Sequence, residues 1–162
     1  MKGKPEVIAL LSKMLREELG AISQYFLHAE MCENWGYSHL SNLIKKQSIG
    51  EMKHAEILIE RILFLEGIPN MADLPKLNIG KDVPQQLEND LDLEKSAVAE
   101  YNQAVASCIK AGDNSSADLM KELLKDEEEH VDFLETQISL IKDLGLENYL
   151  VEQMGEEEEG GK

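Results

Sequence analysis

Cysteine, basic side chains and long apolar runs are all scarce in this sequence of 162 residues. The two cysteines, Cys32 and Cys108, are too few for a disulfide framework and lack the CxxC spacing of zinc and redox sites. We expect both to be buried free thiols, because free cysteine commonly packs as a small apolar side chain.

The shortage of basic residues leaves a strongly negative chain. Sixteen Lys and Arg face 32 Asp and Glu, for a net charge of -16, which repels phosphate backbones and anionic lipid surfaces. We therefore expect cations as partners, and neither nucleic acid nor membrane. No apolar run approaches the roughly 18 residues of a membrane span, and the start MKGKPEV lacks the apolar stretch of a signal peptide. These features predict a cytoplasmic protein.

The length predicts one domain over residues 1–162. With 43% hydrophobic and 30% charged residues, the chain is expected to fold over most of its length. Residues 156–162 form a charge run with glycines, for which we expect a mobile tail. Apolar residues elsewhere recur at steps of three and four, the period of a helix. The expected helices cover about 5–33, 38–67, 82–112, 114–145 and 146–154.

Capping residues support these boundaries. Ser38 is a candidate N-cap of the second helix, Asp82 with Gln85 resembles a capping box for the third, and Asn114 or Ser115 is expected to cap the fourth. Residues 68–81 carry prolines, glycine and asparagine without a clear period, so they predict a long surface connection.

No alternating β-branched segment is bounded by turn signals, so the predicted class is all-α. Two helical hairpins joined by one long crossover between helices two and three are typical of a ferritin-like four-helix bundle, here with a short fifth C-terminal helix. The first helix also has an apolar flank at Leu19, Ile22 and Phe26 beside its core stripe, which indicates a subunit contact.

Two Glu-x-x-His pairs stand on the helices, Glu51 with His54 and Glu127 with His130. At positions i and i+3, a carboxylate and an imidazole share one helix face, so each pair could hold a metal ion. One pair alone would be weak evidence, because surface glutamate is common in this chain.

The spacing of a wider set strengthens the metal interpretation. Glu18 precedes Glu51 by 33 residues, as Glu94 precedes Glu127, and an offset of 76 relates the two sets. The same offset relates Tyr25 to Tyr101 and Cys32 to Cys108, so the chain resembles two copies of one hairpin. Equal distances from each turn place each lone glutamate opposite its own Glu-x-x-His pair.

These polar residues interrupt apolar helix stripes, which predicts that they are buried. Four buried carboxylates in one layer would each cost several kcal/mol without compensation. Two divalent cations would balance their charge if the histidines bind as neutral rings. Oxygen and nitrogen ligands without thiolates suit iron or manganese, and the layout is that of di-iron and di-manganese carboxylate bundles.

The sequence closely resembles the bacterioferritin family over nearly its whole length. The resemblance is carried by MKG, AISQYFLHAEMCENWG, EMKHAEILIERILFLEGIPN, LNIG, DEEEHVDFLETQ and GLENYL. It implies a ferroxidase that oxidises Fe²⁺ with O₂ or H₂O₂ and stores a ferric mineral inside a shell of 24 subunits, built from dimers. The ferroxidase ligands implied are Glu18, Glu51, His54, Glu94, Glu127 and His130. Glu51 and Glu127 would be the bridging carboxylates, and an electron-donor protein could serve iron release.

The resemblance also implies a b-type haem shared between two subunits. Met52 follows Glu51 and is turned about 100° from it around the helix, so it points out of the bundle and would be the axial ligand. The pocket would be lined by Leu19, Ser23, Phe26 and Ile49.

Three positions depart from the family pattern. Family members often carry His, Glu and Asp where this chain has Lys46, Gln47 and Gly50, so an auxiliary iron site on the inner surface is not expected. Tyr25 is a candidate hydrogen-bond partner of the metal ligands or a core tyrosine. For His28 and His39, which match no ligand spacing, we expect surface or packing roles.

Two other functions stay open. A rubrerythrin-like di-iron peroxidase would normally carry paired CxxC motifs, which this chain lacks. A non-catalytic acidic helical interaction protein would need no matched buried carboxylates and would show no Fe²⁺ oxidation.

Overall fold

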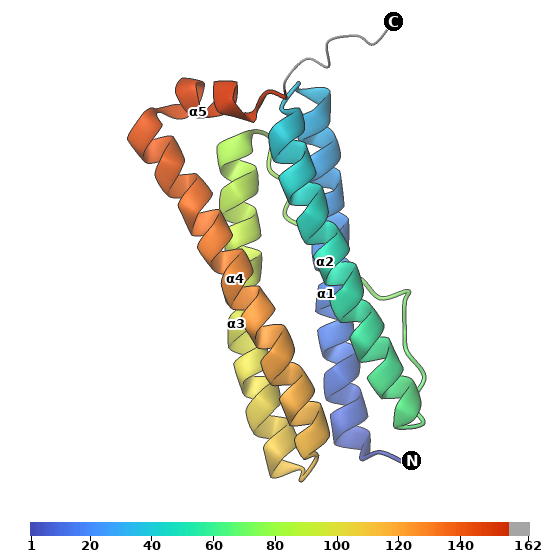
Figure 1. Cartoon of the computed structure of the whole chain (residues 1–162). Coiled ribbons are helices and arrows are strands. Elements are labelled where there is room, and N and C mark those ends of the chain that lie inside the picture. Colours follow the sequence, from blue (N-terminus) through green and yellow to red (C-terminus); the bar gives the residue numbers. More distant parts are fainter. Residues whose placement is uncertain (156–162) are drawn as a thin grey trace, which may run out of the picture.

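A computed structural model describes residues 1–155, and the predicted mobile tail at 156–162 lies outside the described residues. The described part contains no strand. Its helices are α1 (Pro5–Asn34), α2 (Ser38–Phe64), α3 (Val83–Lys110), α4 (Asn114–Leu144) and α5 (Leu146–Gln153). The four long helices form a bundle, and α5 lies across one end of it (Figure 1). The predicted all-α, ferritin-like bundle is confirmed. Within residues 1–155, no helix is long and apolar enough to cross a membrane.

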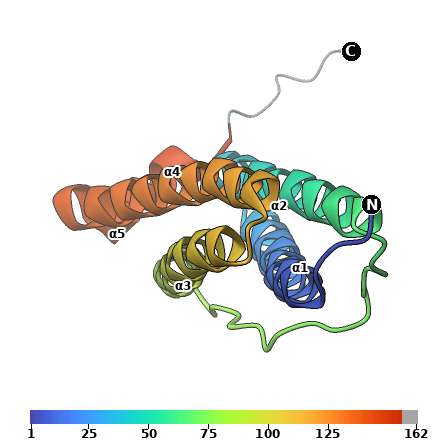
Figure 2. The ribbon, with the colours of Figure 1, turned by 90° about the horizontal axis from the view of Figure 1, so that it is seen from below.

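The long connection between α2 and α3 runs the length of the bundle. It passes over the side formed by α1 and α3, whereas α2 and α4 lie together on the opposite side (Figure 2). This crossover lets both hairpins, α1 with α2 and α3 with α4, stand antiparallel and side by side, as the two-hairpin topology predicts.

Two of the predicted caps are wrong. Ser38 is the first residue of α2 rather than its cap, and its hydroxyl donates to Oε1 of Glu33 at 3.2 Å. The cap of α4 is Asp113, one residue before the predicted Asn114 or Ser115, and its carboxylate accepts the N–H of Ser116 at 3.0 Å. In each case the helix begins early enough to include the residue that was predicted to cap it.

The cap at Asp82 is confirmed, since its carboxylate accepts the N–H of Gln85 at 2.9 Å. The side chain of Gln85 reaches back to the N–H of Lys81 rather than to that of Asp82, so the reciprocal bond of the capping box is displaced by one residue. At the end of α2, Glu66 has a φ of 64°, which ends the helix before Gly67.

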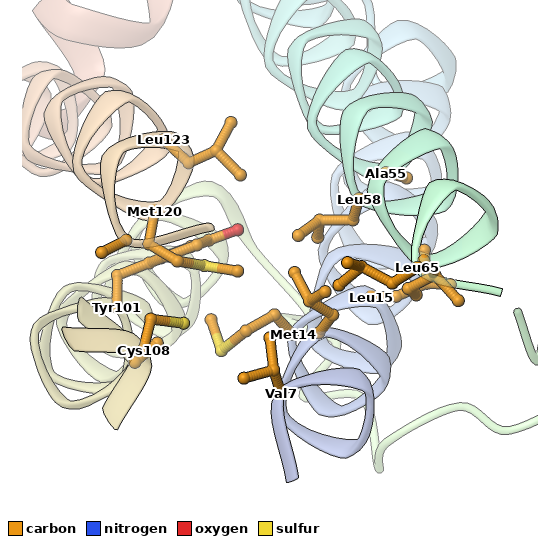
Figure 3. Packing of buried hydrophobic residues seen from close by; sticks show 14 of the residues in the cluster. Val7, Met14, Leu15, Ala55, Leu58, Leu65, Tyr101, Cys108, Met120 and Leu123 are labelled. Atoms are coloured by element: carbon orange, nitrogen blue, oxygen red, sulfur yellow. The ribbon is translucent and has the colours of Figure 1, made fainter. Parts of the chain in front are cut away.

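Apolar side chains from all four long helices fill the bundle in two clusters, one toward each end. Figure 3 shows part of the first cluster, with side chains of α1, α2, α3 and α4 pointing toward one another. The second contains Tyr25, Leu40, Ile44, Leu87 and Leu134 among others. Cys32 and Cys108 are buried free thiols, as predicted. On α2, α3 and α4 the predicted metal-binding residues fall between the two clusters, and on α1 Glu18 lies at the inner end of the first cluster, beside Leu19.

Buried polar groups fix the long connection to the bundle. The Nδ1–H of His28 donates to Asp90 at 3.0 Å, and the ring's Nε2 accepts the N–H of Gly80 at 3.0 Å. The N–H of Asn78 donates to Oε1 of Gln24, whose amide donates to Asp90 at 2.8 Å. His28 therefore has the predicted packing role, whereas His39 is exposed.

Two helical glycines allow a matched test of this packing. A Cβ on Gly20 would lie 2.3 Å from Cγ of Pro75 in the connection, whereas one on Gly50 would meet only His130 Nε2, at 3.9 Å. We expect Gly20→Ala to lower the free energy of unfolding by about 1–3 kcal/mol through overpacking. Gly50→Ala should raise it by about 0.5–1 kcal/mol, since alanine restricts the unfolded chain. Urea unfolding of both variants checks the opposite signs, and equal effects would contradict the close approach at Gly20.

Candidate metal centre

The six residues predicted from the repeat meet at the middle of the bundle. We refer to them as the six-residue cluster: Glu18 from α1, Glu51 and His54 from α2, Glu94 from α3, and Glu127 and His130 from α4. All four carboxylates and His54 are buried, and the side chain of His130 is 13% exposed. Each hairpin therefore contributes one lone glutamate and one Glu-x-x-His pair, as the spacing predicts.

The cluster divides into two overlapping groups. Glu18 and His54 belong to one group, and Glu94 and His130 belong to the other. Glu51 and Glu127 belong to both, and within each group the possible ligand atoms lie within 4.8 Å of one another. Two neighbouring metal positions that share two carboxylates are the arrangement this geometry offers.

Both imidazoles turn their Nδ1 atoms toward the shared carboxylates. Nδ1 of His54 lies 2.9 Å from Oε2 of Glu51 and 3.0 Å from Oε1 of Glu127. Nδ1 of His130 lies 2.9 Å from Oε1 of Glu51 and 3.6 Å from Oε2 of Glu127. The two rings are nearly parallel, at 19°, with centroids 5.9 Å apart. The hairpin repeat is thus expressed as an approximate two-fold symmetry of the cluster.

The cluster also gathers most of the unsatisfied buried polar atoms in residues 1–155. Eight buried side-chain nitrogen or oxygen atoms there make no hydrogen bond, and six of them belong to Glu51, His54, Glu94, Glu127 and His130. Nitrogen and oxygen atoms of these side chains therefore face one another without making hydrogen bonds. Buried atoms of this kind require a partner, and divalent cations match the charge and the donor set. The residues present therefore fit a pair of metal ions.

Burial and close contact set opposite pKa shifts among the four carboxyls. Burial, assisted by the charges of Glu51 and Glu127, raises the pKa of Glu18 well above its usual value. Burial is also the main cause of the raised pKa of Glu94. Against burial, contacts with His130 and His54 lower the pKa of Glu51 and bring that of Glu127 down to about 2. The lone glutamates therefore hold a proton more tightly than the shared ones do.

The two imidazoles complete the charge balance. Burial opposes their protonation, but contacts with the carboxylates, Glu127 foremost, raise the pKa of both imidazoles, that of His130 to about 12. Two imidazolium ions then face two carboxylates. Metal ions that bind at these atoms would displace the protons that they hold.

Two tyrosines hydrogen-bond the lone glutamates across the hairpins. The hydroxyl of Tyr25, on α1, donates to Glu94 on α3, and that of Tyr101, on α3, donates to Glu18 on α1. Burial raises both phenol pKa values well above 10, so these groups remain donors. The hydrogen-bonding role of Tyr25 is confirmed. Tyr101 was missed as a partner, although its offset of 76 from Tyr25 could have identified it.

Asp126 is a further neighbour that sequence reasoning missed. Its carboxylate accepts a hydrogen bond from Nε2 of His54 at 3.1 Å, on the side of the ring that faces away from the cluster. Asp126 is 55% exposed and is one of many acidic residues on α4, so no sequence pattern distinguishes it.

A cavity of about 220 Å³ reaches the cluster from the side that the long connection covers. It is bounded by α1, α3 and Pro75–Asn78 of the connection, and it touches Glu18, Tyr101 and Glu127. Carboxylates also line it, among them Glu17 and Asp92. The cavity therefore lies against the cluster on the side of the connection, with acidic side chains in its lining.

The residues predicted to surround haem lie on α1 and α2 and differ in exposure. The side chain of Glu51 is fully buried, whereas that of the next residue, Met52, is 56% exposed. Phe26 and Ile49 are also exposed, while Leu19 is buried. The hydroxyl of Ser23 is occupied in donating to the carbonyl of Leu19. An exposed thioether, with exposed apolar side chains on the same two helices, fits an axial haem ligand at a subunit contact.

Comparison with known proteins gives consistent results. Residues 8–144 match the ferritin family, described as a ferritin-like domain. The chain is 47% identical to a bacterioferritin of Brucella melitensis over 149 residues, 92% of each chain. It is 45% identical to a bacterial ferritin of Synechocystis, over 95% of this chain and 99% of that one. It is also 42% identical to a bacterioferritin of Mycobacterium leprae, over 92% and 94%.

Proton release tests the charge state of the cluster. Binding of two divalent cations per chain near pH 7 should displace about four protons, one each from Glu18, Glu94, His54 and His130. Cation affinity should therefore rise with pH. Calorimetric titration with redox-inert Zn²⁺ in buffers of different protonation enthalpy measures the number. Release of two protons or fewer would contradict the neutral state of Glu18 and Glu94.

Proposed function

Since this chain belongs to the bacterioferritin family, we propose that it stores iron by oxidising Fe²⁺ at the six-residue cluster and collecting the ferric product inside a hollow shell. The observation that carries the proposal is the pair of overlapping groups that share Glu51 and Glu127. Each of two neighbouring Fe²⁺ ions would lose one electron, and O₂ or H₂O₂ would accept the two electrons together.

The protein's part in this reaction is to hold two like charges close together. The four carboxylates can balance two divalent ions without further charge, and the shared pair, Glu51 and Glu127, bridges the two positions. Tyr25 and Tyr101 orient the carboxyls of Glu94 and Glu18 through hydrogen bonds that do not depend on the metal. The surrounding apolar clusters keep bulk water from these groups, which strengthens their attraction for cations.

The cavity beside Glu18 supports access from the outer side. Its acidic lining and the net charge of -16 favour cations over anions on approach. We place the ferric product on the opposite side, formed by α2 and α4, which would face the interior of the shell. Lys46, exposed on α2, offers no anionic ligand there, so we expect no auxiliary iron site on that surface.

The assembly we propose is a shell of 24 subunits built from dimers. The exposed apolar patch of Phe26, Ile49 and Met52 supports a dimer contact on α1 and α2. Met52 from each of two subunits would bind one b-type haem there. An electron-donor protein that reduces the stored mineral would complete iron release.

Neutralising a shared carboxylate tests the proposed oxidation. We expect Glu127→Gln to reduce rapid Fe²⁺ oxidation to the rate of iron in buffer alone, because it removes a bridging charge while keeping the side-chain volume. Glu128→Gln, the same change at an exposed neighbour, should leave the rate unchanged. Stopped-flow absorbance after mixing with aerobic Fe²⁺ provides the measurement. A wild-type rate in Glu127→Gln would rule out the assignment.

The haem proposal has a separate test. We expect Met52→Leu to remove haem and spare Fe²⁺ oxidation, since leucine keeps the apolar volume but lacks the sulfur. Met71→Leu is a matched control, because Met71 in the connection is also 56% exposed. Visible spectra of the purified variants report haem per subunit. Retention of the wild-type haem bands in Met52→Leu would exclude Met52 as the axial ligand.

A further inference from the structure

The two halves of the six-residue cluster differ on their outer sides. We call Glu18 with His54 the His54 half, and Glu94 with His130 the His130 half. An offset of 76 residues relates the two halves, and both use Glu51 and Glu127. Inside the cluster both imidazoles contact the same two shared carboxylates: each Nδ1 lies 2.9 Å from Glu51, while the distance to Glu127 is 3.0 Å for His54 and 3.6 Å for His130. The groups outside the cluster differ in kind.

The His54 ring is held from both sides. Its Nδ1 faces the shared carboxylates, and its Nε2 donates to Asp126 at 3.1 Å. A carboxylate that accepts the outer N–H of a ligating histidine fixes the orientation of the ring and increases its basicity. Removal of such a partner typically lowers metal affinity by about 10–100-fold.

The His130 ring has no such partner because of a glycine. The offset of 76 residues makes position 50 the counterpart of Asp126, since 126 − 76 is 50. A side chain at position 50 would therefore lie beside His130 as Asp126 lies beside His54. Position 50 is Gly50, and a Cβ built there would lie 3.9 Å from Nε2 of His130, with no other neighbour within 4 Å. The backbone is therefore placed to present a carboxylate to His130, but no side chain does so.

The two histidine side chains also differ in their exposure to solvent. The side chain of His130 is 13% exposed, against 5% for His54. Among residues 1–155, no hydrogen bond is formed by Nε2 of His130, while Nε2 of His54 is bonded. The His130 ring is consequently oriented only by its contacts within the cluster.

We propose that Asp126 is a positioning residue that makes the two metal positions unequal. The His54 half takes the first divalent cation, and the His130 half takes the second with about 10–100-fold lower affinity and exchanges it more readily. This inference rests on the proposed function only in taking the cluster as the cation site.

Redox-inert Zn²⁺ added to the metal-free full chain tests the inequality. Competition with a chromophoric chelator should resolve two binding steps separated by about tenfold or more. Asp126→Ala should weaken the tighter step by about 10–100-fold, and Asp126→Asn, which keeps an acceptor oxygen, should recover part of the loss. Glu122→Ala removes the same charge from an exposed position one turn earlier on α4 and should change neither step. Gly50→Asp should strengthen the weaker step by about tenfold.

A crystal prepared with one equivalent of Zn²⁺ per chain identifies the position directly, through anomalous scattering at the zinc edge. Zinc between Glu18 and His54 is the expected result. Equal occupancy of the two halves, or zinc first at Glu94 and His130, would overturn the inequality and leave the proposed function intact. Absence of zinc from both halves at excess metal would overturn both proposals.

Discussion

The burial of four carboxylates in one layer of the bundle is the constraint on which the rest of this structure depends. Such a layer is unstable unless every oxygen has a partner, because charged groups lose their hydration inside the protein. Two imidazoles and two tyrosine hydroxyls meet part of this demand, and the buried atoms that make no hydrogen bond are those that metal ions would bind. Apolar clusters above and below the layer supply the hydrophobic stabilisation that offsets its cost.

The crossover connection determines which sides of this layer can be reached. By running over α1 and α3, it forms one wall of the cavity beside Glu18 and leaves the α2 and α4 side uncovered within the subunit. Its position is fixed through buried bonds from His28 and Gln24, and by the close approach of Pro75 to Gly20. A connection without secondary structure therefore shapes the surroundings of the layer as much as a helix would.

Much of this arrangement could be predicted from the sequence, because the hairpin repeat is encoded in spacing. Helical periodicity located the long helices, and equal intervals placed Glu18 and Glu94 opposite their Glu-x-x-His pairs. Features that depend on local backbone geometry could not be predicted in this way. Whether Asp113 or Asn114 caps α4 depends on where the turn ends.

Residues beyond the cluster were harder to identify. Asp126 is chemically indistinguishable in the sequence from the other acidic residues of α4, and only the rotation of the helix brings it to His54. The connection carries no periodicity, so nothing in its composition indicated that Pro75 would lie against Gly20.

The crossed tyrosine bonds give the layer a further property, which concerns the alignment of the two hairpins. Because Tyr25 bonds the glutamate of the opposite hairpin and Tyr101 does the same in return, both bonds form at only one relative height. A slip of one hairpin along the other by a single helical turn, about 5.4 Å, would break both bonds and separate the paired carboxylates from their imidazoles. Leucine-rich contacts tolerate such slips far better than buried charges do. The polar layer thus fixes the register between the two hairpins, because its hydrogen bonds and contacts form in only one alignment.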